Sequence, residues 1–166
     1  MPHRSILPAG VSSWTLAKLS VRYRLTSNPI RIQDSQDAAK LLYHTWDEEM
    51  INIQEQMGAL YLNHKLQAIG FRLISTGKLN TTNLDTALLL SCGLLVRAQY
   101  IILAHNHPSG DPTPSKSDIR LTCQLQKTIS LVGMELYDHI ILGQEHWHSM
   151  ADQRNFLPDW MIKEGK

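Results

Sequence analysis

The chain has 166 residues, a formal net charge of +1 and hydrophobic residues at 43% of its sequence. This length and composition are typical of a single globular domain, and they exclude the disordered and fibrous classes. Because the charge is near neutral and no basic run is present, we expect little direct binding to nucleic acid. The sequence lacks an apolar stretch of the kind found in membrane spans and secretory signals, so a cytoplasmic location without membrane contact is expected.

The first half of the chain predicts a strand, a helix and a hairpin after an irregular start. Residues 1–30 should form an N-terminal arm and an edge strand, since residues 19–25 alternate polar and apolar side chains. A helix capped by Asp34 or Ser35 follows, with apolar residues at helical spacing. Only three residues separate the next two strand-like stretches, which predicts an antiparallel hairpin. These stretches occupy residues 53–62 and 66–76.

The second half of the chain predicts two helices and three strands. One helix, capped by Asn83 or the threonines before it, runs to about Arg97, and its many leucines predict burial on more than one side. The other helix runs from Ser115 to about Leu131 and ends before Gly133. The strands occupy residues 100–104, 134–142 and 147–149. Helices and strands are mixed without strict alternation, so we expect a mixed α/β fold.

The most informative stretch is AHNHPSGDPTPSKSD, which covers residues 104–118. On an extended chain His105 and His107 project to the same side, because side chains of a strand alternate with period two. Zinc binds imidazole nitrogens, and a catalytic zinc ion keeps three protein ligands and an open position for water. Asp118 is the best candidate for the third ligand, since the intervening prolines can give the loop a rigid return path. Asp118 also forms a helix capping box with Ser115, so its carboxylate could serve the helix alone.

This stretch resembles a known family. Two histidines separated by one residue, followed after seven residues by Ser-x-x-Asp, resemble the JAMM motif of the JAB/MPN metallopeptidases. The letters HNHPSGDPTPS resemble the RadC branch of that family in particular. The resemblance implies an α/β (α+β) fold of the JAB/MPN or cytidine-deaminase-like type, a three-layer sandwich in which helices flank a curved mixed sheet. It also implies one RadC-like JAB/MPN domain at residues 31–160, followed by a C-terminal tail at residues 161–166.

The same resemblance implies a catalytic glutamate on the first long strand, and Glu55 is the residue that matches. An ionisable group in a strand that enters the core costs several kcal/mol without a partner, and a zinc-bound water is a suitable one. Zinc lowers the pKa of that water toward about 7, Glu55 removes its proton, and the hydroxide attacks a carbonyl carbon. By family analogy Ser115 donates a hydrogen bond to the oxyanion, although a serine before a helix is more often only a cap. The expected cofactor is one zinc ion per chain, held by His105, His107 and Asp118.

Two other groups of residues carry weaker signals. His146 and His148 repeat the two-residue spacing, but no carboxylate follows at a comparable distance, so surface histidines on a hairpin are the favoured interpretation. Asp138 and His139 could orient a metal-bound imidazole from behind, or they could serve the structure alone.

The leading hypothesis is a zinc metallopeptidase or isopeptidase that cleaves an amide bond in a peptide or protein substrate. The alternative is a RadC-like factor of DNA repair or mobile-element transfer, which acts as a binding module without hydrolysis. Two departures from the family bear on this choice. No glycine-centred helix-hairpin-helix is visible before Ile51, and Asp85 is the only acid near the start of a helix where an Arg-Glu pair is expected. The sequence leaves the oligomeric state open.

Overall fold

The computed structural model describes residues 29–77 and 84–156. The N-terminal arm, the strand at residues 19–25 and the tail at residues 161–166 are predictions that lie outside this range. The described residues form three helices and five strands. The helices are α1 (Ser35–Thr45), α2 (Thr86–Leu95) and α3 (Lys116–Ser130). The strands are β1 (Gln56–Leu62), β2 (Ala68–Thr76), β3 (Tyr100–Asn106), β4 (Glu135–Leu142) and β5 (Trp147–Ser149).

The five strands form one mixed sheet in the order β2-β1-β3-β4-β5. β1 pairs antiparallel with both β2 and β3, so the predicted hairpin is confirmed. β3 pairs parallel with β4, and β4 pairs antiparallel with β5. A parallel pair needs a crossover connection, which α3 supplies between β3 and β4.

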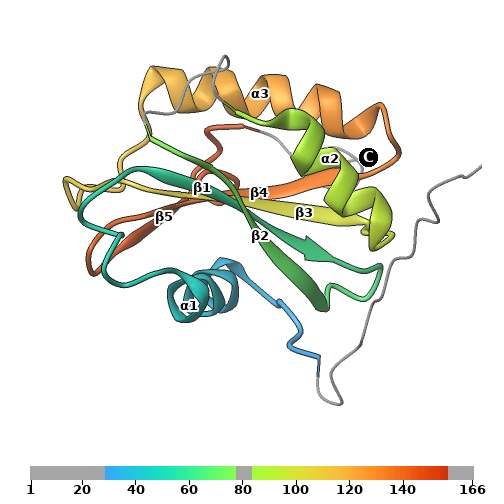
Figure 1. Ribbon diagram of the computed structural model, residues 1–166, viewed down its shortest axis with the longest axis horizontal. Coiled ribbons are helices and arrows are strands. Elements are labelled where there is room, and N and C mark those ends of the chain that lie inside the picture. The colour runs from blue at the N-terminus through green and yellow to red at the C-terminus, as the bar shows by residue number, and fades with distance from the viewer. Residues whose placement is uncertain (1–28, 78–83, 157–166) are drawn as a thin grey trace, which may run out of the picture.

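Helices cover both faces of this sheet, which gives the molecule the three layers of a sandwich (Figure 1). α1 lies on one face, and α2 and α3 lie on the other. Side chains of β3 alternate between the two hydrophobic clusters. Ile101 and Leu103 pack on the side of α2 and α3, whereas Ile102 and Ala104 pack on the side of α1. By the same alternation His105 points to the face that α3 covers, and the predicted three-layer fold is confirmed.

The boundaries of two strands differ from the prediction. β1 begins at Gln56, and Ile53 lies in a turn where 71% of its surface is exposed. Glu55 therefore directly precedes the strand, and the prediction that it lies within the strand is wrong. β3 extends two residues beyond the predicted Ala104, so that His105 belongs to a central, paired strand.

The second helix also differs from the prediction. Its cap is the side chain of Asp85, which accepts a hydrogen bond of 2.8 Å from the backbone of Leu88. Only one side of α2 is buried, since Leu94 and Leu95 near its end are more than half exposed, at 52% and 56%. The number of leucines led to a prediction of more burial than the structure shows, because a leucine can lie on the exposed side of a helix as well as in the core. In the part of the chain that the structure describes, no helix has the length and apolar character needed to cross a membrane.

Candidate metal centre

The residues predicted for the metal site come from three neighbouring elements. His105 lies in β3, and His107 is the first residue after that strand. Asp118 lies in the first turn of α3. Glu55 comes directly before β1, which pairs with β3. The C-terminal end of β3 therefore brings together side chains that are far apart in the sequence.

The loop between β3 and α3 is fixed against the end of β4. The backbone nitrogen of His107 donates a hydrogen bond of 2.9 Å to the carbonyl oxygen of Leu142. Gly110 has a φ of +83°, which a residue with a side chain rarely adopts. A Cβ atom added at Gly143 would collide with the carbonyl oxygen of Gly110, so a glycine is needed for this close approach. These contacts fix the path of the loop from β3 back to α3, as was expected from its prolines.

Two imidazoles and a carboxylate converge at this point. The Nε2 atoms of His105 and His107 lie 3.0 Å apart. The two oxygens of Asp118 lie 3.7 Å from these nitrogens, Oδ1 facing His105 and Oδ2 facing His107. Glu55 is close as well, since its carboxylate and the two imidazoles offer ligand atoms that all lie within 4.8 Å of one another. The group could bind a metal, and it contains two carboxylates that could provide the third ligand.

The hydrogen-bond partner of His107 shows that its Nε2 is an acceptor. Nδ1 of His107 lies 2.7 Å from the carbonyl oxygen of Asp111, and because a carbonyl only accepts, Nδ1 carries the hydrogen. In the neutral ring, Nε2 of His107 is then a lone pair that faces His105 and Asp118. Converging lone pairs repel one another unless a cation or a proton lies between them. Tetrahedral zinc with bonds of about 2.0–2.1 Å separates its ligand atoms by about 3.3 Å. The separations of 3.0 and 3.7 Å bracket that value, so the residues fit such an ion.

The ionisation of the cluster also suits a metal. Burial lowers the pKa of His105 well below its ordinary value, and the neighbouring His139 lowers it further. The neighbouring carboxylate of Asp118 raises the pKa of His107. Burial raises the pKa of Asp118, but its interactions with the neighbouring His107 and Ser115 outweigh burial and hold this pKa below its ordinary value. At neutral pH the carboxylate is therefore ionised and the buried imidazole neutral, which are the forms that bind metals.

Asn106, which lies between the two histidines, holds the segment that carries Glu55. Its side chain points to the opposite face of β3 and is fully buried. Oδ1 accepts a hydrogen bond of 2.8 Å from the backbone of Gln56, and Nδ2 donates to the carbonyl oxygens of Ile51 and Gln54 at 2.7 and 2.9 Å. Asn106 is not among the residues that the sequence predicts for the site. Its only signal in the sequence is an amide side chain between the two histidines, directly after an apolar stretch.

Ser115 is the N-cap of α3 and forms the predicted capping box. Its hydroxyl oxygen accepts a hydrogen bond of 3.2 Å from the backbone of Asp118, whose carboxylate accepts one of 2.7 Å from the backbone of Ser115. Asp118 thus serves the helix end and faces the histidines at the same time. Ser115 also lines a cavity of about 350 Å³ beside the cluster. The other residues that line this cavity are Glu55, His107, Pro108, Ser109, Ser117 and Asp118.

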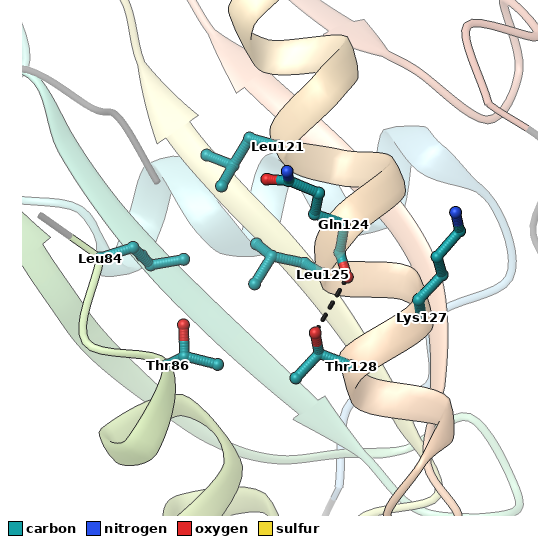
Figure 2. A pocket seen from close by; sticks show the side chains of 7 residues that line it. All are labelled: Leu84, Thr86, Leu121, Gln124, Leu125, Lys127 and Thr128. Carbon is teal, nitrogen blue, oxygen red and sulfur yellow. Dashed lines mark hydrogen bonds between the residues drawn. The ribbon is translucent and has the colours of Figure 1, made fainter. Parts of the chain in front are cut away.

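A second cavity, of about 390 Å³, lies between the start of α2 and one side of α3 (Figure 2). Its lining residues are Leu84, Thr86, Leu121, Gln124, Leu125, Lys127 and Thr128. The hydroxyl of Thr128 is already used, since it donates a hydrogen bond of 3.0 Å to the carbonyl oxygen of Gln124. None of the lining residues offers an imidazole, a thiol or a carboxylate, so this cavity lacks the ligands of a metal site.

The second histidine pair lies outside the cluster. His146 is exposed in the turn between β4 and β5, and Nε2 of His148 lies 2.6 Å from the side-chain oxygen of Asn155. Asp138 is buried, and its carboxylate accepts hydrogen bonds from the hydroxyl of Ser149 and from the backbone of His139. That carboxylate therefore serves the packing of β4 against β5.

The chain is similar in sequence to one family of proteins. A family model described as RadC-like JAB domain matches residues 32–155. A UPF0758 protein of Carboxydothermus hydrogenoformans is 42% identical over 103 residues, which cover 62% of this chain and 46% of the relative. UPF0758 proteins of Aquifex aeolicus and Porphyromonas gingivalis are 33% and 34% identical, over 83% of this chain and 58% and 62% of their own lengths. The chain thus spans about half to three fifths of the length of these relatives.

The family match and the structure agree. The matched residues 32–155 include the eight helices and strands of the described residues, the two histidines, Asp118 and Glu55. The mixed sheet between layers of helices is consistent with a JAB-like fold. The chain belongs to the family of RadC-like JAB domains.

Proposed function

We propose that this domain is a zinc-dependent hydrolase that cleaves an amide bond in a peptide or protein substrate. The observation that supports this most is the convergence of three acceptor side chains beside Glu55, at a cavity of about 350 Å³. A structural zinc site is closed by four protein ligands, whereas a hydrolytic site keeps one position open and places a proton acceptor next to it. The open cavity and the second carboxylate are typical of a hydrolytic site.

In this proposal His105, His107 and Asp118 hold the zinc ion. Asp118 is preferred over Glu55 as the third ligand because each of its oxygens faces one imidazole at 3.7 Å. The capping box also fixes its position on α3, so that little side-chain freedom is lost when a metal binds. Glu55 then serves proton transfer from its place in the wall of the cavity.

Bound zinc supplies a Lewis acid for the carbonyl group and lowers the pKa of water in the site to about 7. The carboxylate of Glu55 accepts a proton from the attacking water and gives it to the amine that leaves. Water thus adds to the carbonyl carbon, the C–N bond breaks, and the products are an acid and an amine. The hydroxyl of Ser115 donates a hydrogen bond to the carbonyl oxygen as that oxygen gains charge. Its oxygen accepts the hydrogen bond of the capping box, and a hydroxyl can donate its own hydrogen at the same time.

The test is a cleavage screen of peptide and isopeptide libraries with the zinc-loaded full chain and its Glu55→Gln variant. The amide is nearly isosteric with the carboxylate but cannot accept the proton. We therefore expect the variant to keep its fold and its zinc and to lose about 10²–10⁴-fold in rate. Glu49→Gln is a matched control, because Glu49 is exposed and the chemical change is the same. The control should cleave at the native rate.

Two outcomes would contradict the proposal. If Glu55→Gln cleaves at the native rate, the base is another residue or the activity belongs to a contaminant. If the zinc-loaded chain cleaves no member of either library, the result supports the alternative of a RadC-like binding module without hydrolysis.

A further inference from the structure

Behind His105, on the side away from His107, three buried side chains form a chain of short hydrogen bonds. Nδ1 of His105 lies 2.8 Å from Nε2 of His139. Nδ1 of His139 lies 2.6 Å from the hydroxyl oxygen of Thr122, which is also 2.6 Å from the backbone carbonyl oxygen of Asp118. His105, His139 and Thr122 all have 0% of their surface exposed. No bulk water reaches these atoms, so they must satisfy one another.

The direction of the hydrogen bonds in this chain follows from its last member. The carbonyl oxygen of Asp118 can only accept, so at 2.6 Å the hydroxyl hydrogen of Thr122 points to it. The Thr122 oxygen is then an acceptor toward His139, whose Nδ1 must carry a hydrogen. A neutral imidazole has one donor and one acceptor nitrogen, so Nε2 of His139 is a lone pair and accepts from Nδ1 of His105.

The reverse direction leaves a poor contact. If Thr122 donated to His139, two oxygen lone pairs would face each other at 2.6 Å, between Thr122 and the Asp118 carbonyl. A second possible acceptor for the Thr122 hydroxyl, Sδ of Met150 at 3.5 Å, is weak and also lies away from His139. Whether the hydroxyl of Thr122 donates to the carbonyl of Asp118 or to Sδ of Met150, its oxygen accepts from Nδ1 of His139, which is therefore the donor.

We propose that His139 is a positioning residue that, together with Thr122, holds His105 in the tautomer whose Nε2 presents a lone pair to the metal centre. The assignment rests on the proposed function, since it gives His105 the form that a metal ligand requires. Metal-binding histidines commonly donate their other N–H to a carboxylate, a carbonyl or water. Here the acceptor is a neutral imidazole, which adds no negative charge of its own behind His105.

This series of hydrogen bonds also connects two of the proposed ligands, because it runs from the side chain of one to the backbone carbonyl of the other. It begins at His105 on β3, passes through His139 on β4 and ends at the backbone of Asp118 in α3. His139 is held in register opposite Leu103, and its own carbonyl oxygen accepts a hydrogen bond of 3.0 Å from the backbone of Met150. The packing of α3 on the sheet therefore sets the orientation of the His105 ring.

The first experiment needs neither a variant nor a metal. Long-range ¹H–¹⁵N spectra of the full chain with ¹⁵N-labelled histidine, free of metal near neutral pH, report which nitrogen of each ring carries the hydrogen. We expect His105 and His139 both as the Nδ1–H tautomer. A His105 ring with its hydrogen on Nε2 would overturn the proposal, even if the chain then proved to bind zinc.

The second experiment measures zinc affinity by competition with a chromophoric chelator. Thr122→Val keeps the side-chain volume but removes the hydroxyl, which is the acceptor for His139 and the donor to the carbonyl of Asp118, so we expect affinity to fall about 10–100-fold. Thr122→Ser restores the hydroxyl and should return affinity to within a few-fold of the native chain. His139→Gln keeps an acceptor for His105 and should lose less affinity than Thr122→Val. Native affinity in a folded Thr122→Val chain would contradict the proposal, whereas failure of the native chain to bind zinc would contradict the metal centre itself.

Discussion

His107 is the most exposed of the three proposed ligands, and its replacement tests the metal centre with the least damage to the core. Its side chain is 18% exposed, whereas His105 is fully buried behind it. We expect the native chain to keep about one zinc ion after dialysis and His107→Ala to keep much less, because two ligands bind far more weakly than three. Metal analysis of the dialysed proteins measures this.

His146→Ala is the matched control for that measurement. His146 is exposed and lies in the β4–β5 turn, and its loss should leave the zinc content unchanged. Retention of a full equivalent of zinc by His107→Ala would remove His107 from the ligand set.

Asp138 gives the protein a stability that depends on pH. Burial raises its pKa to about 6 from an ordinary value of 3.8, although hydrogen bonds from Ser149 and two backbone amides oppose the shift. Between about pH 4 and pH 6 the carboxyl group of Asp138 is protonated in the folded chain and ionised in the unfolded chain. The contribution of Asp138 to the free energy of unfolding is therefore largest below about pH 4 and falls as the pH rises through about 6. The full change is on the order of 2–3 kcal/mol.

Asp138→Asn removes this titration while keeping an acceptor for the backbone amides and a donor toward Ser149. We expect the stability of the variant, relative to the native chain, to increase between about pH 4 and 7. Urea unfolding of both proteins across that range measures the difference. A difference that stays constant with pH would show that Asp138 is ionised in the folded chain throughout.

The residues of the candidate metal centre and Asn106 show how far a sequence reveals the roles of individual side chains. His105, His107 and Asp118 lie within fourteen residues of the sequence. Because imidazoles and carboxylates are metal ligands, such a short spacing indicates a metal site without knowledge of the fold. Asn106 acts on backbone atoms 50 to 55 residues away, and nothing in its local sequence identifies those partners. The partners of His139 were likewise unpredictable, since they depend on the register of β4 with β3 and on the packing of α3.

At the scale of elements, the segment before β1 depends on a side chain from another strand. The carbonyl oxygens of Ile51 and Gln54 and the amide of Gln56 all bond to Asn106, and the carbonyl of Glu55 accepts a further bond of 2.7 Å from Gly77. This explains why the strand starts late. Ile51 and Ile53 alternate with a polar residue as in a strand, but the backbone of this segment turns to meet Asn106 instead of a neighbouring strand.

Asn106→Ala should therefore affect both stability and the placement of Glu55. Removal of the side chain leaves three backbone groups without partners, two of them in a partly buried region, and costs on the order of 3 kcal/mol. We expect faster hydrogen exchange at Gln56 and a lower hydrolytic rate, with zinc retained because the ligands lie on the other face of β3. Denaturant unfolding, amide exchange and metal analysis measure the three effects.

Two results would contradict this assignment. Unchanged amide exchange at Gln56 would show that the segment is held by other contacts. Loss of zinc together with activity, in a variant that remains folded, would show that Asn106 supports the histidines and not the segment of Glu55.

For the whole molecule, the fold class could be predicted because the hairpin, the helices and the motif each constrain it locally. The order of the strands could not, since it depends on pairings between distant segments. The parallel pairing of β3 with β4 decides the site, because it brings His139 behind His105 and leaves α3 to cover the same face. The connection between these two strands is α3 and the loop before it, and the sequence of this connection does not show that the strands pair side by side.

The balance of charge over the whole chain leads to a last prediction, that of weak binding to DNA. With sixteen basic and fifteen acidic residues, few phosphates can be neutralised at one time, and little counterion release is available to drive association. We expect dissociation constants weaker than about 10 µM for labelled duplex and single-stranded DNA near 150 mM salt, with a shallow dependence on salt. Fluorescence anisotropy measures this, and a parallel titration near 50 mM salt gives the slope. Sub-micromolar binding with a steep slope would mean that the basic side chains gather on one surface despite the neutral total, and it would favour the DNA-associated alternative over a peptidase.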